Sequence, residues 1–340
     1  MTKSYKILVT GGAGFIGSNL CEKLLKNKNK VICFDNFSTG SIENISPFIK
    51  NENFKLYKGD IRNYSDCEKV VKGVDFVFHQ AALGSVPRSI KNPIDSSDVN
   101  IGGFNNILFA AINEGVRRFI YAGSSSTYGD STVIPKKEGK IGNPLSPYAI
   151  TKYTNELFAD NFSKIYNIKV IGLRYFNVFG KNQNPDGAYA AVIPKFIMQL
   201  INHESPTING NGTFSRDFTY IDNVVQANIL AMITDDSKIF ENGKSHEVFN
   251  IALGERTNLN ELFEILKENL SRFDKSILKI NPHYGVERKG DVPHSLACID
   301  KAKNILNYNP KYNVRAGIKK SCKWYWNNLK DIIELNKRQS

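Results

Sequence analysis

The sequence is poor in cysteine, and its few cysteines stand far apart. Among 340 residues there are only five, Cys21, Cys33, Cys67, Cys298 and Cys322, and no two of them form a C-x-x-C pair. An odd number of scattered cysteines argues against a disulfide framework and against a zinc site. We therefore expect no metal centre, and we expect the chain to work in a reducing compartment, the cytoplasm.

Long apolar runs are also missing. The apolar run from Ile7 to Val9 ends near a pair of glycines and is too short for the apolar core of a signal peptide. No later segment approaches the roughly 18 apolar residues of a membrane helix. With 41% apolar side chains, 23% charged ones and only 12 prolines, the composition is typical of a globular protein. We expect no membrane partner, and the length favours two lobes over one.

The chain has an excess of positive charge. Forty-five basic residues against 33 acidic ones give a net charge of +12, which suggests an anionic partner. Nucleic acid, a membrane surface and a nucleotide substrate all satisfy that description. The basic residues gather mainly between Lys301 and Arg338, where the exposed face of a helix explains them more simply than a nucleic-acid patch. We therefore expect no nucleic-acid partner.

Short β-branched and aromatic runs alternate with longer amphipathic stretches in the first half of the chain. The expected strands are residues 5–10, 31–35, 54–59, 76–81, 118–123 and 169–176, and the expected helices include 15–26, 64–72, 93–114 and 148–166. This alternation predicts an α/β fold with a doubly wound parallel sheet, the Rossmann architecture. After about residue 180 the rhythm loosens into short helices and loops. We expect one domain over 1–180 and, over 181–340, mainly a smaller α/β lobe, with some segments returning to the first domain.

A glycine-rich segment, LVTGGAGFIGSNL, stands between the first expected strand and the first expected helix. Gly11 can form the tight turn, Gly14 lets the backbone approach a pyrophosphate, and Gly17 permits close packing of helix on strand. The helix N-terminus then offers unpaired N–H groups and partial positive charge to phosphates. Because the glycines lie between a strand and a helix, this segment predicts a dinucleotide-binding turn.

The end of the second expected strand predicts which dinucleotide binds. Asp35 in VICFDN lies eighteen residues beyond Gly17, where a carboxylate can accept hydrogen bonds from an adenosine ribose and would repel a 2′-phosphate. NAD is therefore favoured over NADP. Asp60, at the end of FKLYKGD, could lie near the adenine, although a Gly–Asp turn explains it almost as well.

Tyr148 and Lys152 are four residues apart in SPYAITKYTNE and would share one helix face. Tyrosine is a poor base at neutral pH because its usual pKa is about 10, but an adjacent ammonium and a cationic nicotinamide would both favour the phenolate. The spacing alone is a weak signal. It gains force from YAGSSSTYG, which places the hydroxyls of Ser124 to Thr127 at the strand end where doubly wound sheets bind ligands. A turn with a helix cap is the alternative interpretation of these hydroxyls.

These motifs together resemble the extended short-chain dehydrogenase/reductase superfamily. TGGAGFIG, the Ser124 region and Tyr148-x-x-x-Lys152 carry that likeness, and RYFNVFG, FSRDFTYIDNV and RKGDVPHS are similar to its nucleotide-sugar epimerase branch. QAALGSVPRSI and NPDGAYAAVIPKF resemble UDP-N-acetylglucosamine 4-epimerases in particular. The likeness covers essentially the whole chain.

The resemblance implies a set of site residues. It places catalysis on Ser124, Tyr148 and Lys152. It places NAD against Gly11, Gly14, Phe15, Ile16, Gly17, Asp35, Asn36, Gly40, Asp60, Ile61, Gln80, Ala81, Ala82, Asn100, Tyr148, Lys152 and Phe176. It places a UDP-sugar against Ser85, Arg88, Ser124, Ser125, Ser126, Tyr148, Asn177, Ala191, Val192, Arg216, Arg288, Asp291 and Ser295.

Two positions refine the expected reaction. Related dehydratases carry an Asp–Glu pair just after the serine or threonine, whereas the stretch from Ser124 to Gly129 holds no carboxylate, so hydride removal and return at one carbon is the simplest chemistry. Ser295 stands where epimerases restricted to UDP-glucose and UDP-galactose carry a tyrosine, which leaves room for an N-acetyl group. We therefore expect interconversion of UDP-N-acetylglucosamine and UDP-N-acetylgalactosamine, with UDP-glucose and UDP-galactose left open.

Alternatives remain within and outside this class. An epimerase of UDP-N-acetyl-hexuronic acids or another nucleotide-sugar oxidoreductase is the first, and a catalytically silent NAD-binding scaffold is the second. The resemblance further implies a homodimer that pairs two helices of each subunit. Its apolar contacts could come from Phe104, Ile107, Leu108, Ala111, Leu157 and Phe158, although these could equally face the sheet.

Overall fold

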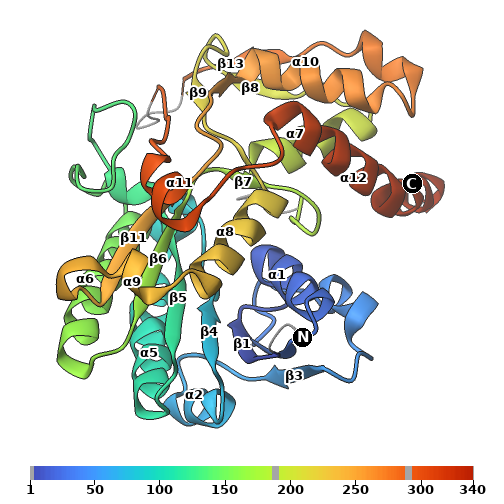
Figure 1. Ribbon diagram of the computed structural model, residues 1–340. Coiled ribbons are helices and arrows are strands. Elements are labelled where there is room, and N and C mark those ends of the chain that lie inside the picture. The colour runs from blue at the N-terminus through green and yellow to red at the C-terminus, as the bar shows by residue number, and fades with distance from the viewer. Residues whose placement is uncertain (1–3, 186–190, 288–292, 340) are drawn as a thin grey trace.

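The computed structural model describes residues 4–185, 191–287 and 293–339, with side chains as far as residue 329. A seven-stranded parallel sheet forms its centre, in the order β11-β6-β5-β4-β1-β2-β3. Its strands are β1 Lys6–Thr10, β2 Lys30–Asp35, β3 Phe54–Lys58, β4 Phe76–His79, β5 Arg118–Ser124, β6 Val170–Tyr175 and β11 His246–Ile251. The predicted doubly wound α/β fold is confirmed (Figure 1).

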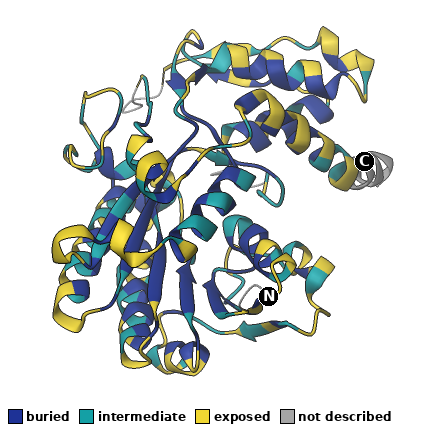
Figure 2. Cartoon of the chain, viewed as in Figure 1, coloured by how far each residue is buried: buried dark blue, intermediate teal, exposed yellow. Residues whose placement is uncertain are grey.

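Helices cover both faces of this sheet because its strands are apolar on both sides. Ile7 and Val9 of β1 belong to one core cluster, and Leu8 belongs to the other. One face packs against α2 Tyr64–Val71, α5 Gly103–Asn113 and α6 Pro147–Tyr166, and the other against α1 Phe15–Lys26 and α8 Ile221–Ile233. Figure 2 shows the strands as the most buried part of the domain.

The strand order reverses between β1 and β4. The chain runs outward from β1 to β2 and β3, and then crosses back to place β4 on the other side of β1. Connections after β1 and β4 therefore leave toward opposite sides, which opens a crevice at the carboxyl ends of these two strands. Gly11 begins the connection after β1, and Gln80 begins the connection after β4.

The expected helix at 93–114 includes a π-helical turn in the structure. It consists of α4 Pro93–Ser97, a π-helical turn Asp98–Gly102 and then α5. Gly103 lies against Ile61, where a Cβ atom would come within 2.5 Å of the isoleucine side chain. The predicted helical segment is confirmed, with a π-helical turn at its centre, and the expected bounds of α1 agree with the structure.

Helices and short strand pairs beyond residue 176 lie outside the main sheet, in the region where a second lobe is expected. The helices there are α7 Val192–Ile201, α10 Leu259–Leu270 and α12 Val314–Gln339, and α3 Val86–Lys91, α9 Asp236–Ile239 and α11 Asp300–Leu306 are short helices elsewhere. The pairs are β7 Val178–Phe179 with β10 Thr219–Tyr220, β8 Thr207–Asn209 with β13 His283–Gly285, and β9 Ser215–Arg216 with β12 Thr257–Asn258. Between these segments, α8 and β11 belong to the main sheet and its cover (Figure 1). A domain boundary near residue 180 stays a prediction.

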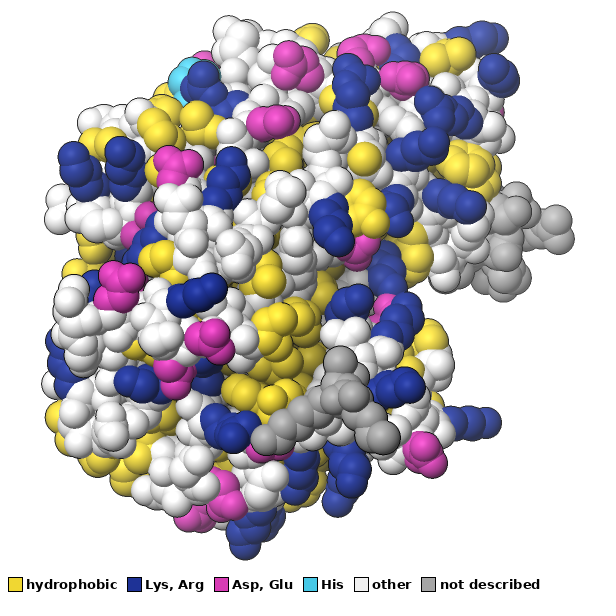
Figure 3. Space-filling model, viewed as in Figure 1, with side chains coloured by type: hydrophobic (Ala, Val, Ile, Leu, Met, Phe, Trp, Pro, Cys, Tyr) yellow, Lys and Arg dark blue, Asp and Glu magenta, His cyan; other side chains and the backbone are white. Residues whose placement is uncertain are grey.

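Two surface properties concern partners. In the part of the chain that the structure describes, no helix combines the length and apolarity that crossing a bilayer requires. Figure 3 shows lysine and arginine side chains on both lobes of the face in view, with acidic side chains among them.

Candidate active site

The glycine turn has a geometry that only glycine permits at two positions. Gly11 has a φ of 66°, and a Cβ atom there would lie 2.7 Å from the backbone nitrogen of Ala81. A Cβ atom at Gly17 would lie 2.0 Å from the carbonyl oxygen of Gly11. Gly14 is the N-cap of α1 and has no side chain to occupy the first N–H groups of that helix. The backbone therefore presents its donors to the crevice, as a phosphate-binding turn requires.

Asp35 supports this turn from the end of β2. Its carboxylate accepts the N–H of Ala13 at 2.9 Å and the N–H of Phe37 at 2.8 Å. The side chain is only 8% exposed, and its burial raises the pKa of the carboxyl above the usual value, against the opposing effect of these hydrogen bonds. Because Asp35 also lines the crevice, it can receive ribose hydroxyls while it holds the turn.

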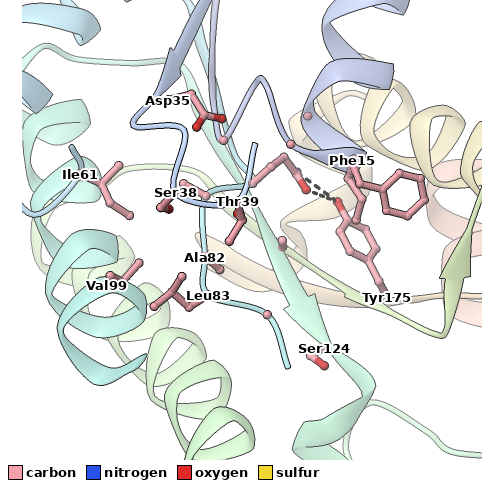
Figure 4. Close-up of a pocket in the computed structure, with 18 of the residues that line it drawn as sticks. Phe15, Asp35, Ser38, Thr39, Ile61, Ala82, Leu83, Val99, Ser124 and Tyr175 are labelled. Carbon is pink, nitrogen blue, oxygen red and sulfur yellow. Dashed lines mark hydrogen bonds between the residues drawn. The ribbon is translucent and has the colours of Figure 1, made fainter. Parts of the chain in front are cut away.

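A cavity of about 380 Å³ occupies the crevice. Figure 4 shows Asp35 toward one end and Ser124 toward the other. The predicted residues on its wall are Gly11, Gly14, Phe15, Ile16, Gly17, Asp35, Asn36, Ile61, Gln80, Ala81, Ala82, Ser124, Tyr148, Lys152 and Asn177. An elongated cavity with a phosphate-binding turn on its wall fits a dinucleotide.

Two predicted cofactor residues, Gly40 and Asp60, are not among the described residues that line this cavity. Gly40 packs its backbone on Ala13, where a Cβ atom would come within 2.9 Å of the Ala13 carbonyl carbon. Asp60 pairs with the Arg62 guanidinium at 2.8 Å, which lowers the pKa of the carboxyl to about 2. Asp60 also accepts a hydrogen bond from Asn36 at 2.8 Å. Because Asn36 lines the cavity, Asp60 can orient a side chain of the cavity wall.

Two further predicted cofactor residues are occupied by contacts within the protein, and their contact with NAD stays a prediction. Asn100 is buried, and its side-chain amide bonds the backbone of Leu83 in both directions and the Thr151 hydroxyl at 3.1 Å. Phe176 is completely buried and packs on Tyr128 with ring centroids 5.9 Å apart. Asn100 therefore braces the loop beside the cavity, and Phe176 fills the core beneath it.

The expected catalytic side chains meet at the end of the cavity formed by β5 and α6. Helix α6 begins with the N-cap Ser146 and Pro147 at its first turn, so Tyr148 and Lys152 fall on its second and sixth positions. The Lys152 ammonium lies 6.0 Å from the centroid of the Tyr148 ring and donates a hydrogen bond to the Ala122 carbonyl at 2.9 Å. The backbone of β5 thus holds the ammonium near the tyrosine ring, on the wall of the cavity.

Burial sets the proton affinities of this pair. Lys152 is only 3% exposed, and desolvation lowers the pKa of its ammonium to about 8. Desolvation raises the pKa of the Tyr148 phenol, and an interaction with the Ser124 hydroxyl acts in the opposite direction. Ser124 itself accepts hydrogen bonds from the N–H and the hydroxyl of Ser126, at 3.2 and 2.9 Å. Near neutral pH the site therefore holds one cation beside a phenol that needs that cation to ionise.

The polar wall residues Ser38, Thr39, Tyr175 and Gln183 were not predicted. The Tyr175 hydroxyl accepts a hydrogen bond from Gln80 at 3.1 Å and another from Asn228 at 2.9 Å. Burial raises the pKa of this phenol to about 12, so it stays neutral and holds Gln80, the residue that directly follows β4. Tyr175 immediately precedes Phe176 in the RYFN motif, and it is Tyr175 that lines the cavity.

A second cavity of about 190 Å³ lies in the smaller lobe. It is lined by Asn177, Val192, Lys195, Phe196, Thr207, Asn209, Phe214, Arg216, Phe218, Leu259 and Glu287. Asn177 also lines the first cavity, so the two cavities meet at this residue. The neighbouring Asp217 accepts backbone N–H groups of Leu253, Gly254 and Ala297, which anchors the segment that carries Arg216.

Of the described residues predicted to bind the sugar nucleotide, only some line one of the two cavities. Asn177, Val192 and Arg216 line the second cavity, and Ala191 is the N-cap of α7 beside it. Ser85, Arg88, Ser125, Ser126 and Ser295 are absent from the walls that the described residues form around either cavity. Ser295 nevertheless lies close to the second one, since its N–H donates to the carbonyl of Ser215 at 3.1 Å. Arg288 and Asp291 lie outside the described residues.

Fold and site together define a class of protein. A glycine turn at the strand switch point binds a dinucleotide, and a serine, tyrosine and lysine meet at one end of the same cavity. This combination is that of the short-chain dehydrogenases and reductases, in which a tyrosine moves a proton while the cofactor moves a hydride.

Comparison with known proteins gives the family. Residues 7–252 match the model of the NAD dependent epimerase/dehydratase family, and the chain belongs to this family. Its cofactor is NAD, in agreement with the prediction from Asp35.

Individual relatives match almost the entire chain. A UDP-N-acetylglucosamine 4-epimerase from Methanobrevibacter ruminantium, solved with UDP-N-acetylmuramic acid, is 38% identical with a TM-score of 0.87, covering 96% of this chain and 99% of its own. A UDP-glucose 4-epimerase from Thermotoga maritima, solved with UDP-glucose, is 37% identical with a TM-score of 0.85. The match covers 95% of this chain and 99% of that one. A UDP-glucuronate 4-epimerase of Thermodesulfobacterium geofontis is 32% identical over 97% of this chain and 98% of its own.

Proposed function

We propose that the protein is a UDP-sugar 4-epimerase that interconverts UDP-N-acetylglucosamine and UDP-N-acetylgalactosamine. The observation that carries this proposal is the position of Tyr148, which shares the wall of the NAD cavity with Ser124 and has the Lys152 ammonium 6.0 Å from its ring. The family and the 4-epimerase relatives support the same reaction class. The absence of a carboxylate from Ser124 to Gly129 favours epimerisation over dehydration.

The residues of the chain divide the work as follows. NAD, when bound, supplies reversible hydride chemistry at the sugar C4 carbon. Tyr148 accepts the proton of the sugar 4-hydroxyl as C4 is oxidised to a ketone, and returns a proton to the same oxygen after the sugar has turned its other face. Lys152 stabilises the phenolate form of Tyr148. The Ser124 hydroxyl hydrogen-bonds the oxygen that loses and regains the proton.

The second cavity is proposed to hold the uridine diphosphate. It adjoins the first at Asn177, so a ligand that spans both would place its sugar near Ser124 and its nucleotide between α7 and the β9 segment. Arg216 and Lys195 supply positive charge on the wall, and a guanidinium can bind phosphate oxygens through paired hydrogen bonds. Phe214 and Phe218 give the cavity apolar surface for a base.

Preference for acetylated sugars rests on Ser295. The residue lies beside Ser215 and Arg216, close to the proposed path of the substrate, and its small side chain leaves space for an acetamido group. We expect Ser295→Tyr to impair turnover of UDP-N-acetylglucosamine more than turnover of UDP-glucose. Equal losses on both substrates would remove the argument for acetamido selection at this position.

One assay tests the reaction itself. Purified protein is incubated with UDP-N-acetylglucosamine, UDP-glucose or UDP-glucuronate, with and without added NAD, and the released sugars are separated chromatographically. We expect the galacto isomer of the acetylated sugar to form, and Tyr148→Phe to abolish its formation while UDP-sugar binding is retained. Epimerisation of the uronate alone would favour the uronic-acid alternative, and full activity of Tyr148→Phe would reject the mechanism.

We also propose that the protein is a homodimer through α5 and α6. Phe104, Ile107, Leu108 and Ala111 are unavailable for such contacts because they are fully buried against the sheet. The outer face carries other apolar groups, among them Leu157 at 54% exposed, and a hollow lined by Tyr64, Phe109, Phe162 and Tyr166. Leu157→Glu should shift the mass measured by light scattering to that of a monomer, and Ile233→Glu, at a comparably exposed residue of α8, should leave it unchanged.

A further inference from the structure

The backbone of the catalytic tyrosine has a partner from a distant part of the chain. The first N–H groups of α6 have no acceptor within the helix. Ser146 caps the helix by accepting the N–H of Ala149 at 3.1 Å. The N–H of Tyr148 is instead accepted by the hydroxyl of Ser89, 59 residues earlier, at 3.0 Å. The position of Tyr148 along the helix axis therefore depends on a side chain outside its own helix.

Ser89 is built for this single acceptor role. It is completely buried in α3 (0% exposed), and its hydroxyl donates its only proton to the carbonyl of Val86 at 2.7 Å. A hydroxyl that donates elsewhere offers only its lone pairs to the N–H of Tyr148. No rotation about its C–O bond can satisfy both Val86 and a second acceptor, so the direction of the bond is fixed.

Helix α3 also carries the residues expected to contact the sugar. Ser85 is its N-cap, with a φ of 133° that residues other than glycine rarely adopt, and its hydroxyl accepts the N–H of Arg88 at 3.2 Å. Ser89 is the next residue after Arg88. Movement of the sugar-side segment would therefore be transmitted directly to the backbone of Tyr148.

The carbonyl of Tyr148 is braced as well. The Tyr148 carbonyl accepts the Thr151 hydroxyl at 2.8 Å, and Thr151 in turn accepts the Asn100 amide at 3.1 Å. Asn100 bonds Leu83, which lines the NAD cavity. The segment after β4 thus braces the backbone of Tyr148 directly through Ser89 at the N–H, and indirectly through Asn100 and Thr151 at the carbonyl.

We propose that Ser89 is a positioning residue, which fixes the Tyr148 phenol in register with the sugar held by α3 and with the Lys152 ammonium. This role deepens the proposed epimerase function and rests on it. Proton transfer needs heavy atoms within hydrogen-bond reach, and displacement by about 1 Å can cost about a hundredfold in rate. The loss should appear in kcat, because Ser89 lines neither cavity wall formed by the described residues.

The chain offers a closely matched control. Ser163 lies in α6, is also 0% exposed, and donates its hydroxyl to the carbonyl three residues earlier, Asp160, at 2.8 Å. Ser163→Ala and Ser89→Ala therefore remove the same kind of buried bond, and only Ser89→Ala also removes the acceptor for Tyr148. Ser89→Thr keeps the hydroxyl and serves as the rescue variant.

The experiment compares these variants in the NAD-loaded protein. For Ser89→Ala we expect kcat to fall about 10- to 100-fold, with the KM for the UDP-sugar within about threefold and a thermal stability close to that of Ser163→Ala; Ser89→Thr should recover most of the rate. A kcat for Ser89→Ala equal to that for Ser163→Ala would overturn the proposal, as would an increase confined to KM.

A second readout does not require the proposed reaction. The ionisation of Tyr148 is measured by ultraviolet difference titration of each protein against its Tyr148→Phe counterpart. Ser89→Ala should raise the pKa of Tyr148 relative to Ser163→Ala, because a displaced phenol loses part of its interaction with Lys152. An unchanged titration would refute the positioning role even if the wild-type protein epimerises UDP-sugars. A shifted titration in a protein that turns over no UDP-sugar would support the role and refute the function.

Discussion

The Lys152→Met substitution tests how much of the basicity of Tyr148 comes from its neighbour. Methionine keeps the buried volume of the side chain but removes the charge. At 6.0 Å from the ring centroid and an effective dielectric constant of about 20, the ammonium stabilises a phenolate by about 3 kcal/mol, which is about two pKa units. The fraction of Tyr148 ionised at neutral pH should therefore fall about a hundredfold, and kcat should fall with it.

The pH dependence separates this electrostatic effect from simple damage. In Lys152→Met, the phenol should titrate well above neutral pH, so kcat should rise about tenfold for each pH unit between about 7 and 9. In the wild type the ammonium has a pKa of about 8, so the cation is lost above that pH and the advantage over the variant should shrink. The ratio of the two rates should therefore decrease steadily with pH.

The assay measures kcat from pH 6 to 9.5 in a constant ionic-strength buffer, about 0.15 M, after extraction has established equal NAD content. Lys164→Met, on the same helix but exposed and paired with Asp160 at 2.6 Å, is the control and should keep the wild-type profile. A rate ratio that does not change with pH, or a Lys152→Met enzyme with more than about a third of the wild-type rate at pH 7, would refute the electrostatic explanation.

Three further outcomes are expected. Glu156→Gln should lower the free energy of unfolding in urea by about 3–5 kcal/mol, because Arg174, bonded to Glu156 at 2.7 and 2.8 Å, would remain as a buried uncompensated charge. Burial lowers the pKa of His79 to about 3, so wild-type stability should fall as pH decreases from about 6.5 toward 3, by up to about 1.4 kcal/mol per unit; His79→Gln should show a shallower slope. Gly17→Ala should lose NAD on gel filtration, because the added Cβ would lie 2.0 Å from a backbone oxygen, whereas Gly139→Ala, with open space around it, should retain NAD.

Local sequence patterns were sufficient for the elements and for the cofactor turn. The helix over residues 15–26 has the predicted bounds, because a glycine turn precedes it and its apolar spacing is regular. Tyr148 and Lys152 meet as predicted, since a four-residue spacing fixes two side chains on one helix face. These predictions depend on contacts within one element, which a linear pattern encodes directly.

Local sequence patterns do not predict contacts between distant segments of the chain. Nothing near Ser89 in the sequence indicates that its hydroxyl accepts the N–H of a residue 59 positions away. The sequence likewise gives no sign that the Asn100 amide bonds Leu83 and Thr151. A polar side chain near a site has several possible partners, and only the folded arrangement of the neighbouring segments decides among them.

Two buried residues control the catalytic tyrosine. Tyr148 can contact substrate, but Ser89 sets its position along the axis of α6, and Lys152 sets its charge state. Both Ser89 and Lys152 are buried. Burial makes these contacts effective, because a hydrogen bond or a charge acts more strongly where water is excluded. Substitution of either residue should therefore produce a defect in kcat that resembles the loss of a reacting group. Residues chosen only by their contact with ligand would omit Ser89, which lines neither cavity wall formed by the described residues.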